Sequence, residues 1–327
     1  MARRIKAPGI RSICWAGETL IDWVAGGRIL HPNGTERYAT VNYAYRFDAV
    51  VSSACGMFAV IYEKRGTKGL VLTQGEVLRE INRSFYHAHD YEYPICIFQT
   101  RSGRTLLVHC SDEYNRLEIE DIVTGERLTS SKERQPADFF HSRLRVSPDG
   151  RWLLSAGWVW HPWNDIAIFD IDAALQKPET LDRSMQLPDI AGEVTAAEFL
   201  HDNRVLISTF EENSSDQDIE AGGAGVNALA VLAPSTFAVL SCVTVAEPVG
   251  TLMPIGDDHV IGFYEHPKLL SHKTGDVLRR WDSIYSGNQL SSLLWAEISV
   301  PPIACDSLNR RFAVADEEHI SIVTVVL

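Results

Sequence analysis

Residues 139–171 read FFHSRLRVSPDGRWLLSAGWVWHPWNDIAIFDI, and they contain the chain's clearest pattern of turns and short strands. Its Ser-Pro-Asp-Gly segment is a tight-turn sequence, because Pro presets φ and Gly tolerates φ > 0. Short apolar runs at 144–146, 152–156 and 166–171 predict three strands, with a polar-aromatic loop at 157–165. One such antiparallel sheet cannot bury both of its faces, so we expect neighbouring sheets of the same kind.

The same turn-and-strand unit recurs along the whole chain. In each unit a turn residue comes directly before a short apolar run that predicts a strand. The turn residues follow one another at intervals of about 40 to 55 residues, close to the length of propeller repeats. They are Gly17, Gly56, Gly103, Gly150, Asn203, Asp258 and Asn309. The repeat therefore predicts seven sheets.

A second turn signal follows later in most units, for example Thr-Gly-Glu at 124–126 and Thr-Gly-Asp at 274–276. Together with the Ser-Pro-Asp-Gly turn, this pattern resembles the WD-repeat and YVTN-type β-propellers. The resemblance implies an all-β fold, a single seven-bladed β-propeller domain spanning residues 1–327. Its blades would be four-stranded antiparallel sheets.

Closure of the ring needs a strand that the seventh unit lacks, because the chain ends before that unit's outermost strand. The resemblance implies that an N-terminal strand, from residues around 3–11, completes this blade and removes the sheet edges. Helical periodicity is sparse, and we expect single helical turns only at 171–176 and 288–298.

The composition limits the classes of partner and compartment. The 43 acidic residues exceed the 30 Lys and Arg, giving a formal charge of −13, which argues against general nucleic-acid binding or an anionic membrane surface. No apolar run reaches the ~18 residues of a membrane span. Charges interrupt what would be the apolar part of a signal peptide, and the six cysteines form no CxxC pair, so we expect a cytoplasmic protein with reduced thiols.

Most of the unusual residues fall in loops that propeller topology places on one face of the ring. Residues 82–94 and 157–165 are the richest of these loops in aromatic and His side chains. Two alternatives remain open: the rings pack on neighbouring blades, or some of them form a platform for a peptide, a sugar ring or a cation. The candidate binding residues are Tyr86, His87, His89, Tyr91, His141, Trp158, Trp160, His161, Trp163 and His266.

Metal and cofactor chemistry has little support in the sequence. His87, His89 and Asp90 are weak candidate metal ligands, because no second cluster has a diagnostic spacing, and we expect no cofactor. The acidic and Gly-rich insertion at 211–227 is expected to be a weakly packed loop.

Two functions are compatible with these patterns. The first is a non-enzymatic scaffold that binds a protein or peptide partner, with a basic peptide favoured, through the aromatic and His-containing loop face. The second is a hydrolase- or lyase-type enzyme with a His–carboxylate or metal site at the channel mouth. The absence of a nucleophile motif from the sequence favours the scaffold.

Overall fold

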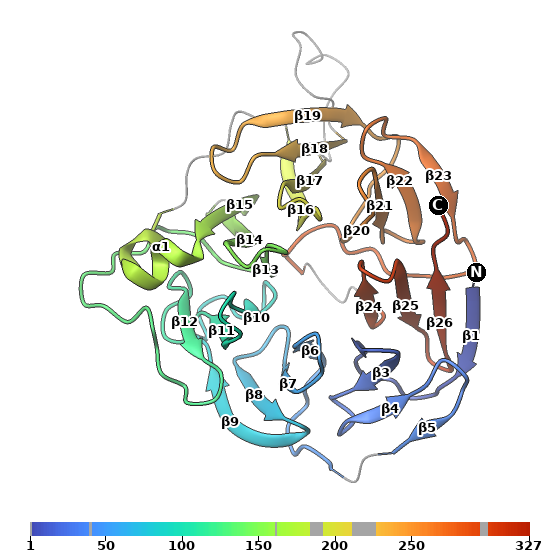
Figure 1. Cartoon of the computed structure of the whole chain (residues 1–327), viewed down its shortest axis with the longest axis horizontal. Coiled ribbons are helices and arrows are strands. Elements are labelled where there is room, and N and C mark those ends of the chain that lie inside the picture. The colour runs from blue at the N-terminus through green and yellow to red at the C-terminus, as the bar shows by residue number, and fades with distance from the viewer. Residues whose placement is uncertain (1, 39–40, 161, 184–191, 211–226, 295–299) are drawn as a thin grey trace.

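The computed structural model describes the chain except residues 1, 39–40, 161, 184–191, 211–226 and 295–299. Its strands form seven antiparallel sheets that lie around a ring, so the all-β, seven-bladed propeller is confirmed (Figure 1). Consecutive sheets along the chain are neighbours in the ring, as the repeat predicts. We number them as blades 1 to 7.

The first three blades follow the predicted repeat closely. Blade 1 contains β2 (Cys14–Ala16), β3 (Thr19–Asp22), β4 (Arg28–Leu30) and β5 (Glu36–Arg37). Blade 2 contains β6 (Ala49–Ser52), β7 (Phe58–Tyr62), β8 (Lys68–Thr73) and β9 (Glu76–Asn82). Blade 3 contains β10 (Ile95–Gln99), β11 (Thr105–His109) and β12 (Glu118–Asp121), with a single bridge between Glu120 and Arg127 at the place of its outer strand.

The other four blades complete the ring. Blade 4 contains β13 (Leu144–Val146), β14 (Trp152–Val159) and β15 (Trp163–Asp170). Blade 5 contains β16 (Glu193–Phe199), β17 (Val205–Phe210), β18 (Ala228–Leu232) and β19 (Val239–Thr244). Blade 6 contains β20 (Leu252–Ile255), β21 (His259–Gly262), β22 (Lys268–Ser271) and β23 (Val277–Arg280). Blade 7 contains β24 (Ile303–Asp306), β25 (Arg311–Ala315), β26 (His319–Thr324) and the N-terminal strand β1 (Ala2–Lys6).

Closure by an N-terminal strand is confirmed at blade 7. β1 pairs antiparallel with β26, and Ile5 lies opposite Ile320. Ile5 is buried with the core residues of blades 1 and 7. The chain stays on this edge beyond the strand, since Ala7 donates its N–H to the carbonyl of Glu318 at 2.8 Å. The strand therefore supplies both the missing hydrogen bonds and an apolar contact.

Helix replaces the outer strand of blade 4. The short helix α1 (Ile171–Gln176) confirms the predicted turn, and a 3₁₀ turn (Pro178–Leu181) follows it. Asp170 caps α1 by accepting the N–H of Ala173 at 3.0 Å. The second expected helical turn is wrong where it is described, because residues 288–294 contain no helix.

The predicted loop at 157–165 is wrong for most of its length. β14 and β15 extend the hairpin to a register pair between Val159 and Trp163. The bulky residues of this segment favour strand, and Gly157 allows another chain segment to approach. A Cβ on Gly157 would lie 2.0 Å from the carbonyl oxygen of Phe140, and instead Phe140 pairs with Trp158 across this gap.

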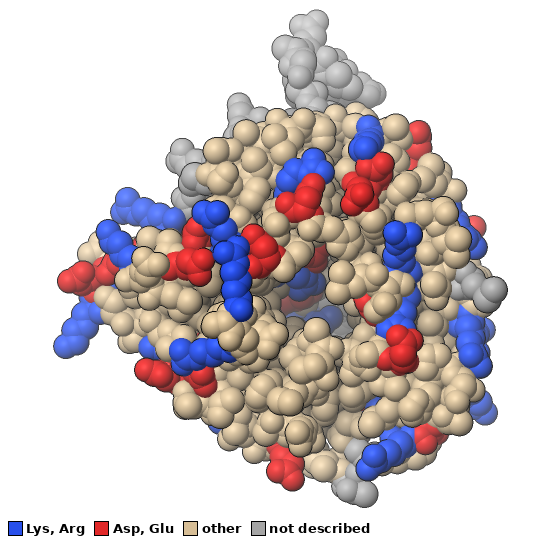
Figure 2. Space-filling view, viewed as in Figure 1, with Lys and Arg blue, Asp and Glu red and all other residues tan. Residues whose placement is uncertain are grey.

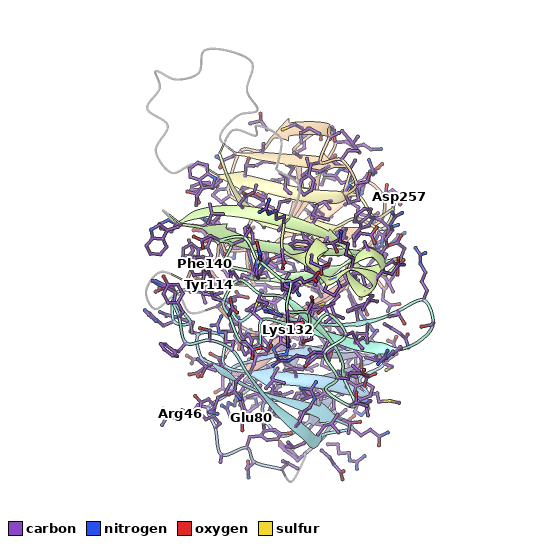
Figure 3. The ribbon with its side chains drawn as sticks, turned by 90° about the vertical axis from the view of Figure 1, so that its left-hand side faces the viewer. Arg46, Glu80, Tyr114, Lys132, Phe140 and Asp257 are labelled. Carbon is purple, nitrogen blue, oxygen red and sulfur yellow. The ribbon has the colours of Figure 1, made fainter. Side chains whose placement is uncertain are left out.

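Two faces result from this arrangement. Figure 3 shows Tyr114 and Phe140 on one side of the ring and Asp257 on the other. The face that carries Asp257 is hollowed at the centre of the ring, and acidic and basic side chains are mixed around the hollow (Figure 2). Within the described residues, no helix is long and apolar enough to cross a membrane.

Candidate functional site

Six rings from four segments of the chain meet on the face opposite Asp257, and we call this group the aromatic surface. Two come from the connection between blades 2 and 3, one from blade 3, one from the connection between blades 3 and 4, and two from the blade 4 hairpin. They are Tyr86, His87, Tyr114, Phe140, Trp158 and Trp160.

The floor of the aromatic surface is closely packed. Phe140 and Trp158 stack with ring centroids 3.7 Å apart and planes 9° from parallel. Tyr91 meets both rings edge-on, at 5.7 Å and 5.9 Å. All three side chains are at most 2% exposed, so burial accounts for them without a ligand. Burial also raises the pKa of Tyr91, which keeps its hydroxyl protonated.

The upper rings of the aromatic surface remain half exposed. Trp160 is 52% exposed and Tyr86 is 47% exposed. The ring centroids of Trp160 and Trp158 lie 6.0 Å apart, and those of the stacked pair Tyr86 and Phe140 also lie 6.0 Å apart. Both upper rings therefore rest on the buried floor. The two upper rings are therefore supported from below and half exposed to solvent.

The side chain of His87 links the aromatic rings to the carboxylate of Asp90. His87 Nδ1 lies 2.7 Å from an Asp90 carboxylate oxygen, and the ring of Trp160 is 5.3 Å away. His89 Nε2 lies 3.3 Å from the other Asp90 oxygen. Among the described residues no three His, Cys, Asp or Glu side chains are grouped to hold a metal ion. The contacts of the two His residues are therefore with one carboxylate and with rings.

Residues 285–294, which we call the strap, extend from blade 6 to the loop that carries Tyr91 (Figure 1). At one end the backbone N–H of Ser286 donates to the carbonyl oxygen of Glu265 at 2.8 Å. At the other end the N–H of Leu294 donates to the carbonyl oxygen of Asp90 at 2.8 Å. Leu293 is buried and packs with Tyr91, Phe140 and Trp158. The strap thus fixes one side of the floor from across the ring.

The remaining predicted site residues lie apart from the aromatic surface or beyond what is described. His141 is buried within blade 4, where its Nδ1 lies 3.1 Å from Ser155 Oγ, and burial lowers its pKa to about 3. His266 Nδ1 lies 2.9 Å from the carbonyl oxygen of Ile284 in blade 6. Trp163 is 47% exposed opposite Val159 at the end of the blade 4 hairpin. His161 and nearly all of the 211–227 insertion lie outside the described residues.

Three members of the site were absent from the candidates that the sequence indicates. Phe140, Tyr114 and Leu293 complete the floor and its margin. The Phe139-Phe140 pair was a usable signal, because it lies in a connection assigned to the same face. Tyr114 lies between the second and third strands of blade 3, in a connection that propeller topology also places on this face. Leu293 reaches the floor from the connection after blade 6, and no local pattern marks it.

A carboxylate also lies at the margin of the aromatic surface. Tyr114 donates its hydroxyl to Asp138 at 2.7 Å. Partial burial and this hydrogen bond raise the pKa of Tyr114, so the hydroxyl remains a donor at neutral pH. With Asp90 beside His87, the exposed rings therefore have acidic neighbours on two sides.

No family model and no curated protein matches this chain. A chain in the crystal structure of the mitotic checkpoint complex is similar in fold, with a TM-score of 0.63. The match covers 99% of this chain and 91% of that one, at 14% sequence identity. This chain has the fold of a seven-bladed β-propeller. The similarity extends over all seven blades. Because only 14% of the residues are identical, it supports a shared fold and says nothing about function.

Proposed function

We propose that this propeller is a non-enzymatic scaffold that binds a protein or peptide partner through its aromatic surface. The observation that carries the proposal is the half-exposed pair Trp160 and Tyr86, held on a buried aromatic floor. Large exposed rings contribute little to folding, and they are the side chains most enriched at the energetic centres of protein interfaces. Because the floor is packed, these rings lose little further freedom when a partner binds.

The charge around the rings favours a basic or amphipathic partner. The chain carries a formal charge of −13, and Asp90 and Asp138 flank the exposed rings. Carboxylates attract a cationic side chain, and an aromatic face holds it with about 0.5–2 kcal/mol per contact. A phosphorylated or nucleic-acid partner would meet repulsion at the same place.

The enzymatic alternative rests on the His87–Asp90 pair. A catalytic base needs a free approach to its substrate, within ~3 Å of the proton that it accepts. Rings surround His87 instead, with the centroids of Tyr86, Trp160, Phe140 and Trp158 at 4.6, 5.3, 5.9 and 6.3 Å. This packing orients the imidazole as part of a contact surface, which supports binding over catalysis. The proposed role requires no cofactor.

Affinity capture from the native source tests the proposal. Wild-type protein, Trp160→Ala, Tyr86→Ala and the control Leu308→Ala would be immobilised, and retained proteins would be quantified by mass spectrometry. Leu308 is 86% exposed and lies in the turn between β24 and β25. Leu308→Ala is therefore a control that removes an exposed apolar side chain outside the aromatic surface. We expect the two aromatic variants to lose the same proteins that Leu308→Ala keeps. Retention of an identical set by all four would contradict the proposal.

A further inference from the structure

β19 is the outer strand of blade 5 and lies on the rim of the ring (Figure 1). Five of its six residues are exposed, and Val243 is half-buried. The exposed residues include two large apolar ones, Val239 at 43% and Leu240 at 52%. The strand behind it, β18, is buried along its whole length. β19 therefore covers the core of blade 5 and is itself exposed to solvent.

The backbone of β19 has hydrogen-bonding groups that face away from β18. Val245 donates its N–H to the carbonyl oxygen of Asn227 at 2.9 Å, and this bond fixes the phase of the ladder between the two strands. Bonded and non-bonded pairs alternate along an antiparallel ladder, so the groups of every second residue point away from the neighbouring strand. In β19 these residues include Cys242 and Thr244. Their N–H and C=O groups therefore point toward the rim, where another strand can pair with them.

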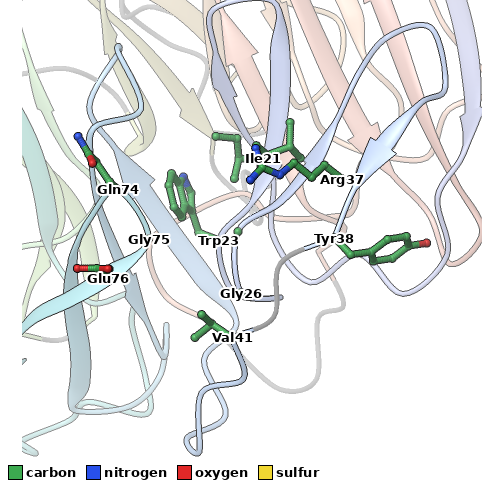
Figure 4. A pocket seen from close by; sticks show the side chains of 11 residues that line it. Ile21, Trp23, Gly26, Arg37, Tyr38, Val41, Gln74, Gly75 and Glu76 are labelled. Atoms are coloured by element: carbon green, nitrogen blue, oxygen red, sulfur yellow. The ribbon is translucent and has the colours of Figure 1, made fainter.

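The other outer strands of the ring carry charges that β19 lacks. The charged residues are Glu36 and Arg37 on β5, Glu76, Arg79 and Glu80 on β9, Arg279 and Arg280 on β23, and Arg3, Arg4 and Lys6 on β1. Figure 4 shows two of them, Arg37 and Glu76, beside a groove between blades 1 and 2. In blade 4 the helix α1 takes the place of an outer strand. Charges and helices at a sheet edge prevent pairing with another chain, and among the outer strands that the structure describes only β19 lacks this protection.

The absence of charge extends from β19 into the sequence around it. Residues 228–246 contain no Asp, Glu, Lys, Arg or His, whereas the whole chain carries a formal charge of −13. The first charged residue after this stretch is Glu247, and its carboxylate is paired with Lys268 at 2.7 Å and with Arg280. Two copies of an acidic chain repel one another over most of their surface. At β19 they can approach without placing like charges opposite one another.

We propose that β19 pairs with β19 of a second copy of this chain, in an antiparallel, two-fold symmetric ladder that joins blade 5 of one propeller to blade 5 of the other. A two-fold interface uses the same patch on both copies, so one uncharged strand suits both sides. The outward groups of Cys242 and Thr244 gain partners, and Val239 and Leu240 lose part of their exposure. No residue of β19 belongs to the aromatic surface, so this interface goes beyond the proposed function.

Sedimentation velocity of the full chain tests the pairing. The series extends to about 100 μM, because an interface of one strand from each copy is small and weak. We expect the wild type to shift from monomer to dimer within this range. Cys242→Lys places two like charges opposite or diagonal to one another and should weaken dimerisation at least about tenfold. Two controls should dimerise as the wild type does: the uncharged Cys242→Ser, and Cys55→Lys, which adds the same charge at an exposed turn between β6 and β7.

Cross-linking identifies the strand at the interface. In an antiparallel pair centred on Ser241 or Cys242, the two Cys242 side chains lie directly opposite, with Cβ atoms about 5 Å apart, or diagonally, about 7–8 Å apart. A short bismaleimide should therefore give a covalent dimer with the wild type and with Cys55→Ser, but not with Cys242→Ser.

Three results would each overturn the inference: a wild type that stays monomeric at every concentration, a Cys242→Lys variant that dimerises as tightly as the wild type, and an undiminished covalent dimer in Cys242→Ser. The first result would leave the edge of β19 to a strand of a different protein.

Discussion

The closure of the ring and the aromatic surface both join parts of the chain that are far apart in sequence. They differ in how far their apolar side chains are buried. At the closure, β1 and β26 pair along their length and Ile5 is buried in the core. At the aromatic surface, the floor is equally buried while Trp160 and Tyr86 stay about half exposed above it. The closure therefore buries its apolar side chain in the core. The aromatic surface contains apolar area that folding leaves unused.

The largest effect should follow from removing the closing strand. Deletion of residues 1–10 exposes the edge of β26 and the core around Ile5. We expect aggregation, or a fall in melting temperature of about 10 °C or more, measured by differential scanning calorimetry. Arg3→Ala, which alters only an exposed side chain of β1, should melt within about 1 °C of the wild type. A truncated protein as stable as the full chain would contradict the closure.

A second test divides the aromatic surface into floor and upper rings. Trp158 and Trp160 are two residues apart, but one is 2% and the other 52% exposed. Trp158→Ala should reduce the free energy of unfolding by about 3–5 kcal/mol, because it leaves a cavity beside Phe140. Trp160→Ala should cost less than about 1 kcal/mol. Urea unfolding of the two variants measures both values, and similar losses would remove the distinction between floor and upper rings.

A smaller effect should appear with pH at His141, behind the aromatic surface. Burial lowers the pKa of His141 to about 3, whereas an unfolded His titrates near 6.5. The unfolded chain thus binds a proton that the folded protein excludes, and stability falls as pH drops below about 6.5. Relative to His141→Gln, the wild type should lose about 1 kcal/mol between pH 6 and pH 5. Parallel urea titrations at the two pH values check this, and an unchanged difference would show that His141 is protonated when folded.

Local chemistry explains why most of the fold was predictable. The Ser147–Gly150 turn depends on its own residues: Ser147 Oγ and Asp149 lie 2.6 Å apart, and Gly150 has φ of +73°. Repeated seven times with apolar runs, such turns predict the blade number, and the missing outer strand predicts the closure.

The candidate site was less predictable because its geometry depends on long-range packing. The sequence placed Tyr86, His87, Trp158 and Trp160 on one face, and the structure brings these four together. It did not distinguish buried from exposed rings. That distinction arises at Gly157, where Phe140 approaches the strand and covers Trp158, and at the strap, where Leu293 arrives from blade 6.

In our proposal, the upper rings of the aromatic surface bind a partner. Its most direct test is a calorimetric titration of the captured partner into wild-type protein, Trp160→Ala and Leu308→Ala. We predict binding at least about tenfold weaker for Trp160→Ala, with its melting temperature nearly unchanged, and wild-type affinity for Leu308→Ala. Equal affinity for Trp160→Ala and the wild type would show that the exposed rings are not the binding surface.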